Sequence, residues 1–211
     1  MKWTAADHDD LVRIIEREVD DPRIVDAFRS VRREDFVPEG AEGEAYEDRP
    51  VPLPNRQTTS QPSLIARMID AAAIEPDDRV LEIGTGYGFQ TALLASLARE
   101  VVSVDRYPEL VEAARANLAD GGFTNVTVIL GDGWDPIPDR GPFDATIVSA
   151  AAPEIPDALV DQLVEGGRLV IPLKTGRGEL VELFVKTATG MRRERHITPA
   201  RFVPLVRGVD A

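Results

Sequence analysis

The sequence predicts an α/β protein with a doubly wound, mostly parallel sheet, an N-terminal helical cap and C-terminal antiparallel edge strands. Three observations lead to this fold class. Between residues 79 and 173, short apolar runs alternate with helical patterns, which is typical of parallel strands joined by crossover helices. Two amphipathic helical patterns precede this region, and strand-like runs separated by short turns follow it. The expected sheet is therefore Rossmann-like and covered on both faces.

The N-terminal cap, residues 1–54, is predicted from two helices and the loops after them. Residues 7–18 place aliphatic side chains on one helical face, and Asp21-Pro22 is a typical start for the second helix. The acidic stretch 39–44 is expected to be a loop, and the prolines in residues 50–54 exclude regular helix there. The cap is expected to lie in front of the core and not to form a separate domain.

The predicted cofactor-binding core, residues 55–175, begins with a loop rich in hydroxyl groups. Residues 57–60, here called the serine loop, end in three consecutive hydroxyl side chains before a helical pattern that runs to about Ala73. Ser60 is expected to be the N-cap of this helix. Hydroxyl groups, unpaired backbone N–H groups and the helix dipole together favour an anion at such a position. An N-cap with a polar loop explains the stretch equally well without a ligand.

The rest of the chain is interpreted as alternating strands and helices followed by a meander. The expected core strands cover residues 80–83, 101–105, 126–130, 143–148 and 168–173. The expected helices run from the turn after the first strand to Arg99, over residues 108–118 and over residues 158–164. The C-terminal part, residues 176–211, is expected to contribute strands at 179–186, 190–197 and 202–206.

A glycine-rich turn follows the first core strand in the stretch Val80-Leu81-Glu82-Ile83-Gly84-Thr85-Gly86-Tyr87-Gly88. Glycines at alternate positions allow a tight turn and let the backbone approach a ligand without an intervening Cβ. The pattern is E-x-G-x-G-x-G, and Phe89 stands where a dinucleotide-binding G-x-G-x-x-G turn needs its third glycine. The turn alone is a weak signal, because glycine turns also simply join strands to helices.

Acidic residues follow the next two strands. Asp105 ends the second strand, where a carboxylate can accept hydrogen bonds from two ribose hydroxyls, and Asp132-Gly133 follows the third strand. Each acid has an ordinary alternative, as a solvated strand end, a helix N-cap or a turn residue. Because the glycine turn and both acids stand at strand ends in this order, we expect them to line one cofactor-binding cleft.

Composition restricts the classes of function. The chain has 211 residues and a formal net charge of -13, which repels a phosphate backbone, so no nucleic-acid partner is expected. The basic run at residues 192–196 is short and interrupted by an acid, so a solvated strand face is preferred there. No apolar run approaches the roughly 20 residues that span a membrane, and residues 1–4 do not resemble the start of a leader. A cytoplasmic monomer is expected.

The supply of catalytic side chains is small. There are no cysteines, which excludes disulfides, thiolate nucleophiles and cysteine-based metal sites, and no metal is expected. His8 and His196 are the only histidines. His8 is expected to face solvent on the first helix and His196 to lie on an edge strand, and neither is expected to be catalytic.

Several stretches of the chain resemble those of a known family. The glycine turn resembles motif I of the class I S-adenosylmethionine-dependent methyltransferases. More specific stretches are similar to signatures of the protein-L-isoaspartate (D-aspartate) O-methyltransferases: Tyr46-Glu47-Asp48, Gln57-Thr58-Thr59-Ser60-Gln61-Pro62, Leu81-Glu82-Ile83-Gly84-Thr85-Gly86, Gly131-Asp132-Gly133, Pro153-Glu154-Ile155-Pro156 and Phe202-Val203-Pro204-Leu205. They follow one another in order along nearly the whole chain.

The resemblance implies a repair enzyme that transfers a methyl group from S-adenosyl-L-methionine to the free carboxylate of L-isoaspartyl residues in damaged proteins and peptides. S-adenosyl-L-homocysteine is the product, and acceptance of D-aspartyl residues stays open. The resemblance implies Ser60 as the catalytic residue and Thr58 and Thr59 at the substrate. Arg56, just before them, is also expected to bind substrate, through its charge. The implied cofactor-binding residues are Gln57, Thr58, Thr59, Ser60, Glu82, Gly84, Thr85, Gly86, Asp105, Arg106, Asp132 and Gly133. Among them, Asp105 would hold the ribose, and Asp132 with Gly133 would recognise adenine.

The region of the serine loop departs from the family pattern. The family commonly has glycine and isoleucine where this chain has Arg56 and Thr59. Arginine restricts the backbone if φ is positive there, and it adds a cation near the substrate. Three alternatives stay open: a different acceptor, a cofactor-binding protein without catalysis, and a nicotinamide-dependent dehydrogenase, which Phe89 disfavours. Methyl transfer to a carboxylate needs no general base, because carboxyl groups with unperturbed pKa values of about 4 are ionised at neutral pH.

Overall fold

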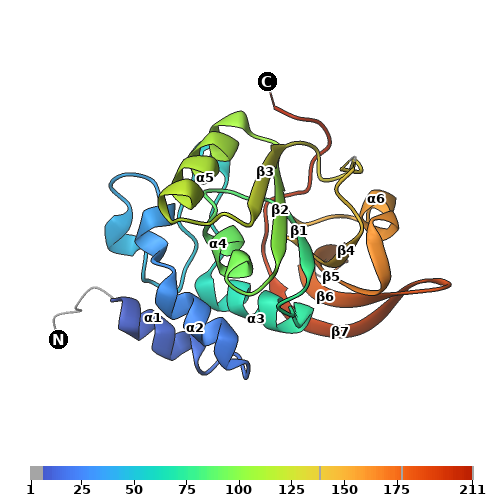
Figure 1. The fold of residues 1–211 in the computed structure, drawn as a ribbon, viewed down its shortest axis with the longest axis horizontal. Coiled ribbons are helices and arrows are strands. Elements are labelled where there is room, and N and C mark those ends of the chain that lie inside the picture. Colours follow the sequence, from blue (N-terminus) through green and yellow to red (C-terminus); the bar gives the residue numbers. More distant parts are fainter. Residues whose placement is uncertain (1–6, 138, 177, 211) are drawn as a thin grey trace.

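The computed structural model describes residues 7–137, 139–176 and 178–210. They form one seven-stranded sheet in the order β3-β2-β1-β4-β5-β6-β7, and Figure 1 shows the helices arranged around it. The prediction of an α/β fold with a mostly parallel sheet is confirmed. The N-terminal stretch that was compared with a leader lies outside the described residues.

The first five strands run parallel to one another, and the sixth and seventh join the sheet through antiparallel pairs. The strands are β1 (Arg79–Ile83), β2 (Glu100–Asp105), β3 (Val126–Leu130), β4 (Phe143–Val148), β5 (Leu163–Thr175), β6 (Gly178–Thr187) and β7 (Gly190–Ala200). β1 pairs in parallel with both β2 and β4, whereas β6 pairs antiparallel with β5 and β7. The strand order therefore reverses beside β1, and open α/β sheets bind their ligands at such a switch point.

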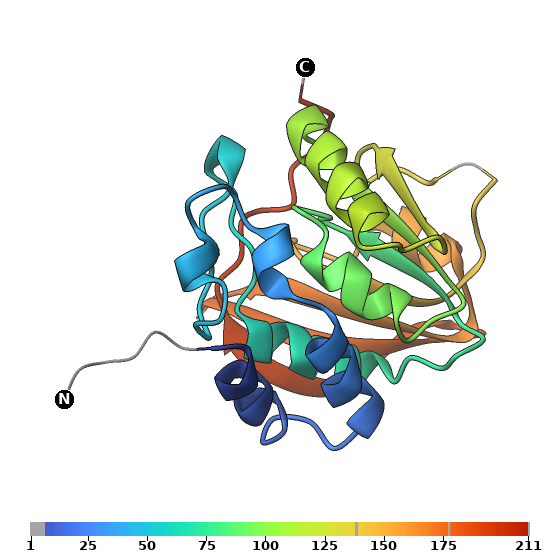
Figure 2. The same ribbon diagram turned by 60° about the vertical axis from the view of Figure 1, so that its left-hand side comes forward.

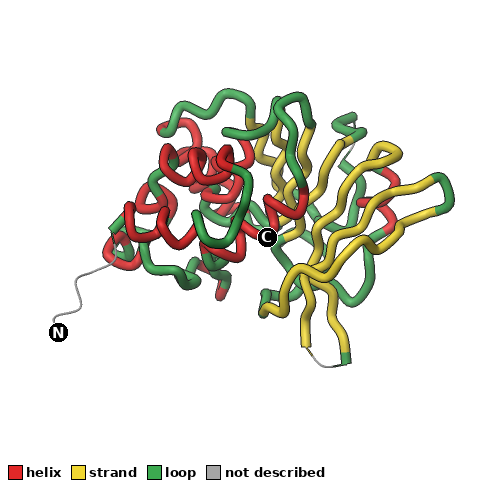
Figure 3. Tube along the Cα trace, turned by 90° about the horizontal axis from the view of Figure 1, so that it is seen from below, coloured by secondary structure: helices red, strands yellow, loops and turns green. Residues whose placement is uncertain are grey.

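The helices cover the two faces of the sheet unequally. They are α1 (His8–Ile15), α2 (Pro22–Ser30), α3 (Pro62–Ala72), α4 (Phe89–Ala95), α5 (Pro108–Asp120) and α6 (Asp157–Asp161), with short 3-10 turns η1 (Arg33–Phe36), η2 (Glu42–Glu44) and η3 (Pro54–Arg56). The buried residues of α1 to α5 belong to the core on one face, and Figure 3 shows most of the helices gathered on one side of the strands. α6 packs on the opposite face. Among the described residues, no helix has the length and apolar character needed to cross a membrane.

The larger hydrophobic core joins the cap to the sheet. Phe28 of α2 packs in the same cluster as Met68 of α3 and Leu93 of α4, and Figure 2 shows the cap helices beside α3. A second core on the other face contains Phe143 of β4 and Leu159 of α6. The cap helices are thus packed into the body of the protein, while the predicted boundaries after residues 54 and 175 remain predictions.

Local sequence explains where the cap helices begin. Asp7 precedes α1 and its side chain accepts a hydrogen bond from the backbone N–H of Asp10 at 2.9 Å. Asp21 precedes α2 and accepts from the N–H of Arg23 at 2.8 Å, with Pro22 in the first helical position. Both acids satisfy N–H groups that have no partner inside the helix, so these starts agree with the sequence prediction.

Three helices are shorter than the sequence predicts: α1, which ends at Ile15 and not at residue 18, and also α4 and α6. α4 ends at Ala95 and not at Arg99, and the side-chain amide of Asn125 donates to the carbonyl oxygen of Ala95 at 2.9 Å. α6 ends at Asp161 and not at residue 164, because β5 already begins at Leu163. After α4 and α6 the chain soon enters a strand, and the sheet takes over the backbone hydrogen bonds.

The predicted strand at residues 202–206 is wrong. This stretch has one isolated bridge with Ala151 and belongs to none of the seven strands. The N–H of Ala151 donates to the carbonyl oxygen of Val203, and the N–H of Leu205 donates to the carbonyl oxygen of Ala151, both at 2.8 Å. Pro204 lies between them and has no N–H with which to extend a ladder.

Candidate active site

A cavity lies at the carboxyl ends of β1, β2 and β4, where the strand order reverses. Its wall combines apolar side chains with a small number of polar groups, as is usual for small-molecule sites. Its wall includes many of the predicted site residues: Gln57, Thr58, Thr59, Ser60, Gly84, Thr85, Gly86, Asp105, Arg106 and Gly133. The topology therefore brings together the serine loop, the glycine turn and the end of the second strand.

The glycine turn needs glycine for both conformation and space. Gly84 and Gly86 have φ values of 96° and 57°, which L side chains rarely adopt. A Cβ on Gly84 would lie 3.2 Å from the Cβ of Ser149, and one on Gly86 would lie 3.3 Å from the Cδ1 of Leu53. The turn consequently presents its backbone at the cavity wall.

Asp105 lies on the same wall at the end of β2 and is largely buried. Its Oδ2 accepts a hydrogen bond from the backbone N–H of Gly86 at 2.9 Å, and its Oδ1 accepts from the N–H of Tyr107 at 3.1 Å. Burial raises the pKa of this carboxyl, while the backbone hydrogen bonds act in the opposite direction. Each oxygen retains a second lone pair, so the carboxylate can still accept hydrogen bonds from a diol.

Glu82 lies behind the cavity and is not on its wall. Its side chain is entirely buried, and its carboxylate accepts from the hydroxyls of Ser103 and Thr91, each at 2.5 Å, and from the amide of Gln90 at 2.9 Å. Burial raises its pKa to about 7, although these three hydrogen bonds act to lower it. Gln90 stands between this carboxylate and the cavity, so Glu82 supports the wall from behind, and its predicted cofactor role remains a prediction.

Gln90 and Ser149 both line the cavity, and neither was predicted from the sequence. The amide nitrogen of Gln90 donates to the hydroxyl oxygen of Ser149 at 2.9 Å as well as to Glu82. Its Oε1 is buried without a hydrogen-bond partner among the described residues. Unpaired buried acceptors are uncommon and costly, so this oxygen suits a ligand that donates a hydrogen bond. The sequence signal that could have identified Gln90 as a site residue is its position in the first helical turn after the glycine motif.

A second cleft lies on the other side of the serine loop. Thr58, Thr59, Ser60, Ser149 and Val203 line both this cleft and the cavity. They form the partition between the two spaces. Within the described part of the chain, the hydroxyl of Ser60 has no hydrogen-bond partner, so it is free for a ligand.

The prediction that Ser60 caps α3 is wrong. Gln61 occupies the N-cap position and its side chain does not cap the helix. Asp48 of the cap accepts from the backbone N–H of Ser63 at 2.9 Å and from the side-chain amide of Gln61 at 2.8 Å. This acid already serves the helix N-terminus, so the predicted anion site at the helix end is replaced by a free hydroxyl beside it.

Thr59 is held by the structure more tightly than its neighbours in the serine loop. It is buried, and its hydroxyl oxygen accepts from the N–H of Val51 at 3.0 Å and from the guanidinium of Arg33 at 2.8 Å. Both lone pairs are therefore used, and the hydroxyl hydrogen alone remains for a substrate. Thr58 forms an antiparallel backbone bridge with Pro52. The predicted substrate role is thus left mainly to Ser60 and Thr58.

Asp132 does not line the cavity, although the next residue does. Its Oδ1 accepts from the N–H of Trp134 at 2.8 Å and its Oδ2 accepts from the N–H of Gly208 at 2.5 Å. Gly133 is on the wall, where a Cβ would lie 2.4 Å from a side chain of β1. The Asp132 side chain therefore anchors the C-terminal segment, whose residues 203–206 line the cavity, and its predicted adenine contact remains a prediction.

Arg56 lines neither space. Its side chain is exposed, and its φ is 57°, equal to that of the preceding Asn55. The restriction expected for a non-glycine residue with positive φ is therefore present at two consecutive positions. The predicted cation at the substrate is not part of either wall.

The two histidines also lie outside both walls. His8 is half-buried, with its Nε2 2.7 Å from the carbonyl oxygen of Phe28 and its ring stacked on Tyr46 at 5.1 Å between centroids. The prediction of a solvent-facing His8 is wrong, because the ring fills a gap between cap segments. His196 lies on β7 as predicted and contacts Glu182 at 2.8 Å.

The chain has close relatives among known proteins. A family model for protein-L-isoaspartate (D-aspartate) O-methyltransferase matches residues 6–210. Protein-L-isoaspartate O-methyltransferase of Koribacter versatilis is 45% identical over 192 residues, covering 90% of this chain and 86% of that protein. The enzyme of the same name from Methanoculleus marisnigri is 51% identical over 157 residues, covering 74% and 71%. A solved structure of a protein-L-isoaspartate O-methyltransferase matches with a TM-score of 0.87 at 29% identity, over 96% of this chain and 67% of that one. The chain therefore belongs to the protein-L-isoaspartate (D-aspartate) O-methyltransferase family.

Proposed function

We propose that this chain is a methyltransferase that uses S-adenosyl-L-methionine to esterify the free carboxylate of L-isoaspartyl residues in proteins and peptides. One observation carries the proposal: the serine loop is a partition with the strand-end cavity on one side and the second cleft on the other. A methyl donor in the cavity and a peptide in the cleft would meet at the hydroxyls of this loop. Membership of the family supports the same activity.

The cavity fits S-adenosyl-L-methionine in three respects. The glycine turn lets a ligand approach the backbone closely, and Asp105 at the end of β2 suits a ribose diol. The unpaired Oε1 of Gln90, with Glu82 behind it, suits the positively charged amino group of the methionine part. When bound, S-adenosyl-L-methionine supplies an electrophilic methyl group.

The acceptor needs orientation and not a base. An isoaspartyl carboxylate is ionised at neutral pH, so no proton has to be removed before it attacks. The free hydroxyl of Ser60 can donate a hydrogen bond to one carboxylate oxygen and leave the other directed at the partition. Holding two reactants at near-attack distance is worth on the order of 7 kcal/mol or more. The negative charge of the acceptor is lost during transfer, so a neutral hydroxyl suits the transition state.

The methyl ester is a better electrophile than the original carboxylate. The nitrogen of the following peptide bond can attack the ester carbonyl, with methanol as the leaving product and a succinimide as the ring that forms. This later step needs no group from the protein.

The remaining expectations from the sequence, namely a cytoplasmic location, a monomer and the absence of nucleic-acid partners, are part of this proposal.

The activity is tested with a matched pair of peptides that contain either an isoaspartyl or an aspartyl residue at one position. We expect methyl incorporation from labelled S-adenosyl-L-methionine into the isoaspartyl peptide and not into its isomer, with a D-aspartyl peptide as a third arm. Binding of S-adenosyl-L-homocysteine is measured in parallel. Binding without incorporation into any peptide would favour a different acceptor or a non-catalytic protein, and absence of binding would reject the whole proposal.

A further inference from the structure

Arg33, in η1 of the cap, is a fully buried arginine whose guanidinium reaches the serine loop. Its side chain is 0% exposed, and its Nη2 donates to the hydroxyl oxygen of Thr59 at 2.8 Å and to the carbonyl oxygen of Ser60 at 3.3 Å. The same guanidinium donates to three carbonyl oxygens of the cap, those of Ala45 at 2.8 Å, Glu47 at 3.0 Å and Arg49 at 3.0 Å. One side chain therefore ties the serine loop to the segment 45–49.

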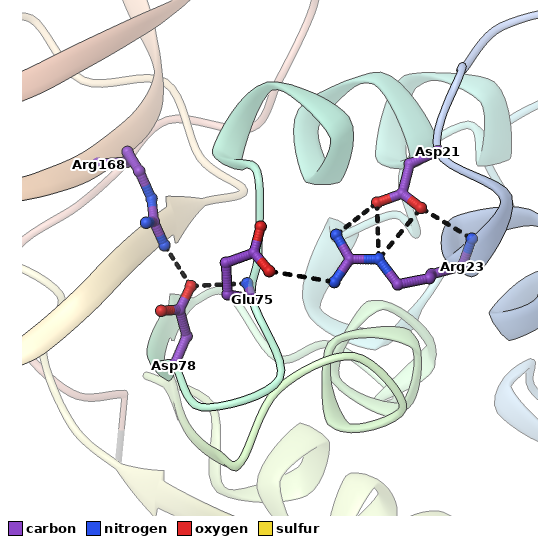
Figure 4. Close-up of polar contacts among 5 residues, drawn as sticks. All are labelled: Asp21, Arg23, Glu75, Asp78 and Arg168. Atoms are coloured by element: carbon purple, nitrogen blue, oxygen red, sulfur yellow. Dashed lines mark hydrogen bonds and ion pairs between the residues drawn. The ribbon is translucent and has the colours of Figure 1, made fainter.

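Arg33 differs from Arg23 and Arg168 in the choice of its partners. Figure 4 shows Arg23 bonded to the carboxylates of Asp21 and Glu75, and Arg168 bonded to the carboxylate of Asp78. All five oxygens bonded to Arg33 belong to carbonyl groups or to a hydroxyl. Nη1 and Nη2 of Arg33 have partners, whereas its Nε is buried without one among the described residues. A buried arginine is costly unless its donors are satisfied, so the contacts of the two terminal nitrogens hold this side chain to the loops that it joins.

The nearest acid does not take the role of a bonded partner. The charge of Asp48 acts on Arg33, but its two oxygens are used by Ser63 and Gln61 at the start of α3. Burial lowers the pKa of Arg33 to about 10, so the guanidinium stays protonated at neutral pH. The donors of Arg33 are therefore available to the loop oxygens at neutral pH.

We propose that Arg33 is a positioning residue for methyl transfer, which fixes the backbone at Thr59 and Ser60 so that the Ser60 hydroxyl faces the acceptor carboxylate. The inference rests on the proposed function. Arg33 lines neither the cavity nor the second cleft, so it acts through the serine loop and not on a ligand. The two spaces meet at this loop, and a displacement of about 1 Å between reacting groups can cost about 100-fold in rate.

The planar fork of arginine is needed for this arrangement. Nη1 serves two of the acceptors, and Nη2 serves the other three, from the cap and the serine loop together. A lysine carries its three donors on one nitrogen atom and cannot reach both groups of acceptors from one position. Arg33→Lys keeps the charge and releases the serine loop, which makes it the informative substitution.

The first experiment compares Arg33→Lys with Arg168→Lys. Arg168 is also largely buried and bonded, but it contacts Asp78 at the opposite end of the strands and lines neither space. We expect Arg33→Lys to lower kcat for an isoaspartyl peptide by at least tenfold, with the Kd of S-adenosyl-L-homocysteine changed by less than threefold. Arg168→Lys is expected to lower Tm and to leave kcat within twofold.

The second experiment removes the Thr59 hydroxyl, which accepts from Arg33 and from the N–H of Val51. Thr59→Val keeps the shape of the side chain and loses the acceptor, whereas Thr59→Ser keeps the acceptor and loses a methyl group. We expect kcat of the valine variant to be at least fivefold lower than kcat of the serine variant. This pair remains informative if Arg33→Lys does not fold.

The results separate this inference from the proposed function. A wild-type protein that does not methylate the isoaspartyl peptide contradicts the proposed function. An active wild type with an equally active Arg33→Lys variant overturns the role of Arg33 alone. The role is also overturned if Arg33→Lys weakens S-adenosyl-L-homocysteine binding and turnover by the same factor, or if the two Thr59 variants have equal kcat.

Discussion

The amide nitrogen of Gln90 lies 2.9 Å from Oε1 of Glu82, and this contact joins a buried carboxylate on β1 to the wall of the cavity. The nitrogen of Gln90 also donates to Ser149, so both of its hydrogens are directed into the protein. The carbonyl oxygen of the amide is consequently the part of Gln90 left for a ligand. The orientation of this amide therefore depends on a carboxylate that lies behind the cavity wall.

Glu82 is expected to make stability depend on pH. Burial raises its pKa from an ordinary value of 4.5 to about 7, so folding favours its protonated form. The contribution of Glu82 to the free energy of unfolding is fully present below pH 4.5 and is lost as the pH rises through 7. Relative to Glu82→Gln, the free energy of unfolding of the wild type should fall by on the order of 3 kcal/mol between pH 4.5 and 8.

Urea unfolding at a series of pH values measures this difference. Glu165→Gln is the matched control, because Glu165 is exposed on β5 and its removal should leave the pH profile of the wild type unchanged. Parallel pH profiles for the wild type and Glu82→Gln would contradict the assigned ionisation of Glu82.

Gln90→Met is expected to weaken cofactor binding. Methionine fills a similar volume but has no amide, so the cavity loses the acceptor and Glu82 loses one donor. We expect the Kd of S-adenosyl-L-homocysteine to rise by about tenfold, the cost of one hydrogen bond to a charged group. Calorimetric titration measures the change. Gln162→Met removes a bonded glutamine near α6 outside both spaces and should leave the Kd within twofold; equal effects of the two variants would refute the role of Gln90.

Ser60→Ala is expected to slow methyl transfer without loss of cofactor binding. The Ser60 hydroxyl makes no other contact in the described chain, so its removal should not destabilise the serine loop. We expect kcat/KM for an isoaspartyl peptide to fall by about 10- to 100-fold and the Kd of S-adenosyl-L-homocysteine to change by less than twofold. Ser96→Ala on the far end of α4 serves as the control. Turnover of Ser60→Ala equal to the wild type would show that the hydroxyl does not orient the acceptor.

Arg56→Gly is expected to stabilise the protein. Arg56 has a φ of 57°, which costs about 1 kcal/mol for a side chain with a Cβ and little for glycine. The free energy of unfolding should therefore rise by about 1 kcal/mol. KM for the isoaspartyl peptide should stay the same, because the side chain lines neither space.

Arg56→Ala keeps the backbone strain and removes the charge, so it should not stabilise. Asn55→Gly should gain less than Arg56→Gly, since asparagine tolerates positive φ better than arginine does. A raised KM in both Arg56 variants would instead return the residue to the substrate site that the sequence predicted.

Much of the architecture could be predicted because it depends on local patterns. Alternating apolar runs and helical faces placed the five parallel strands, and two of them, Val126–Leu130 and Phe143–Val148, have the predicted bounds. The glycine turn and Asp105 were also placed correctly on the cavity, because parallel topology brings successive strand ends to one edge. These features need no knowledge of which distant side chains meet.

The partners of the polar side chains were decided by the tertiary structure alone. Asp48 caps a helix that begins 14 residues later, Asp132 holds Gly208 near the C-terminus, and Arg33 bonds the serine loop from the cap. Hydrophobic periodicity records which face of an element is buried, but it does not record which buried charge finds which oxygen. The sequence by itself therefore determined the fold and the place of the site. Only packing decided which residues of the motifs face the cavity, since the same carboxylate can bind a ligand or satisfy a backbone N–H group.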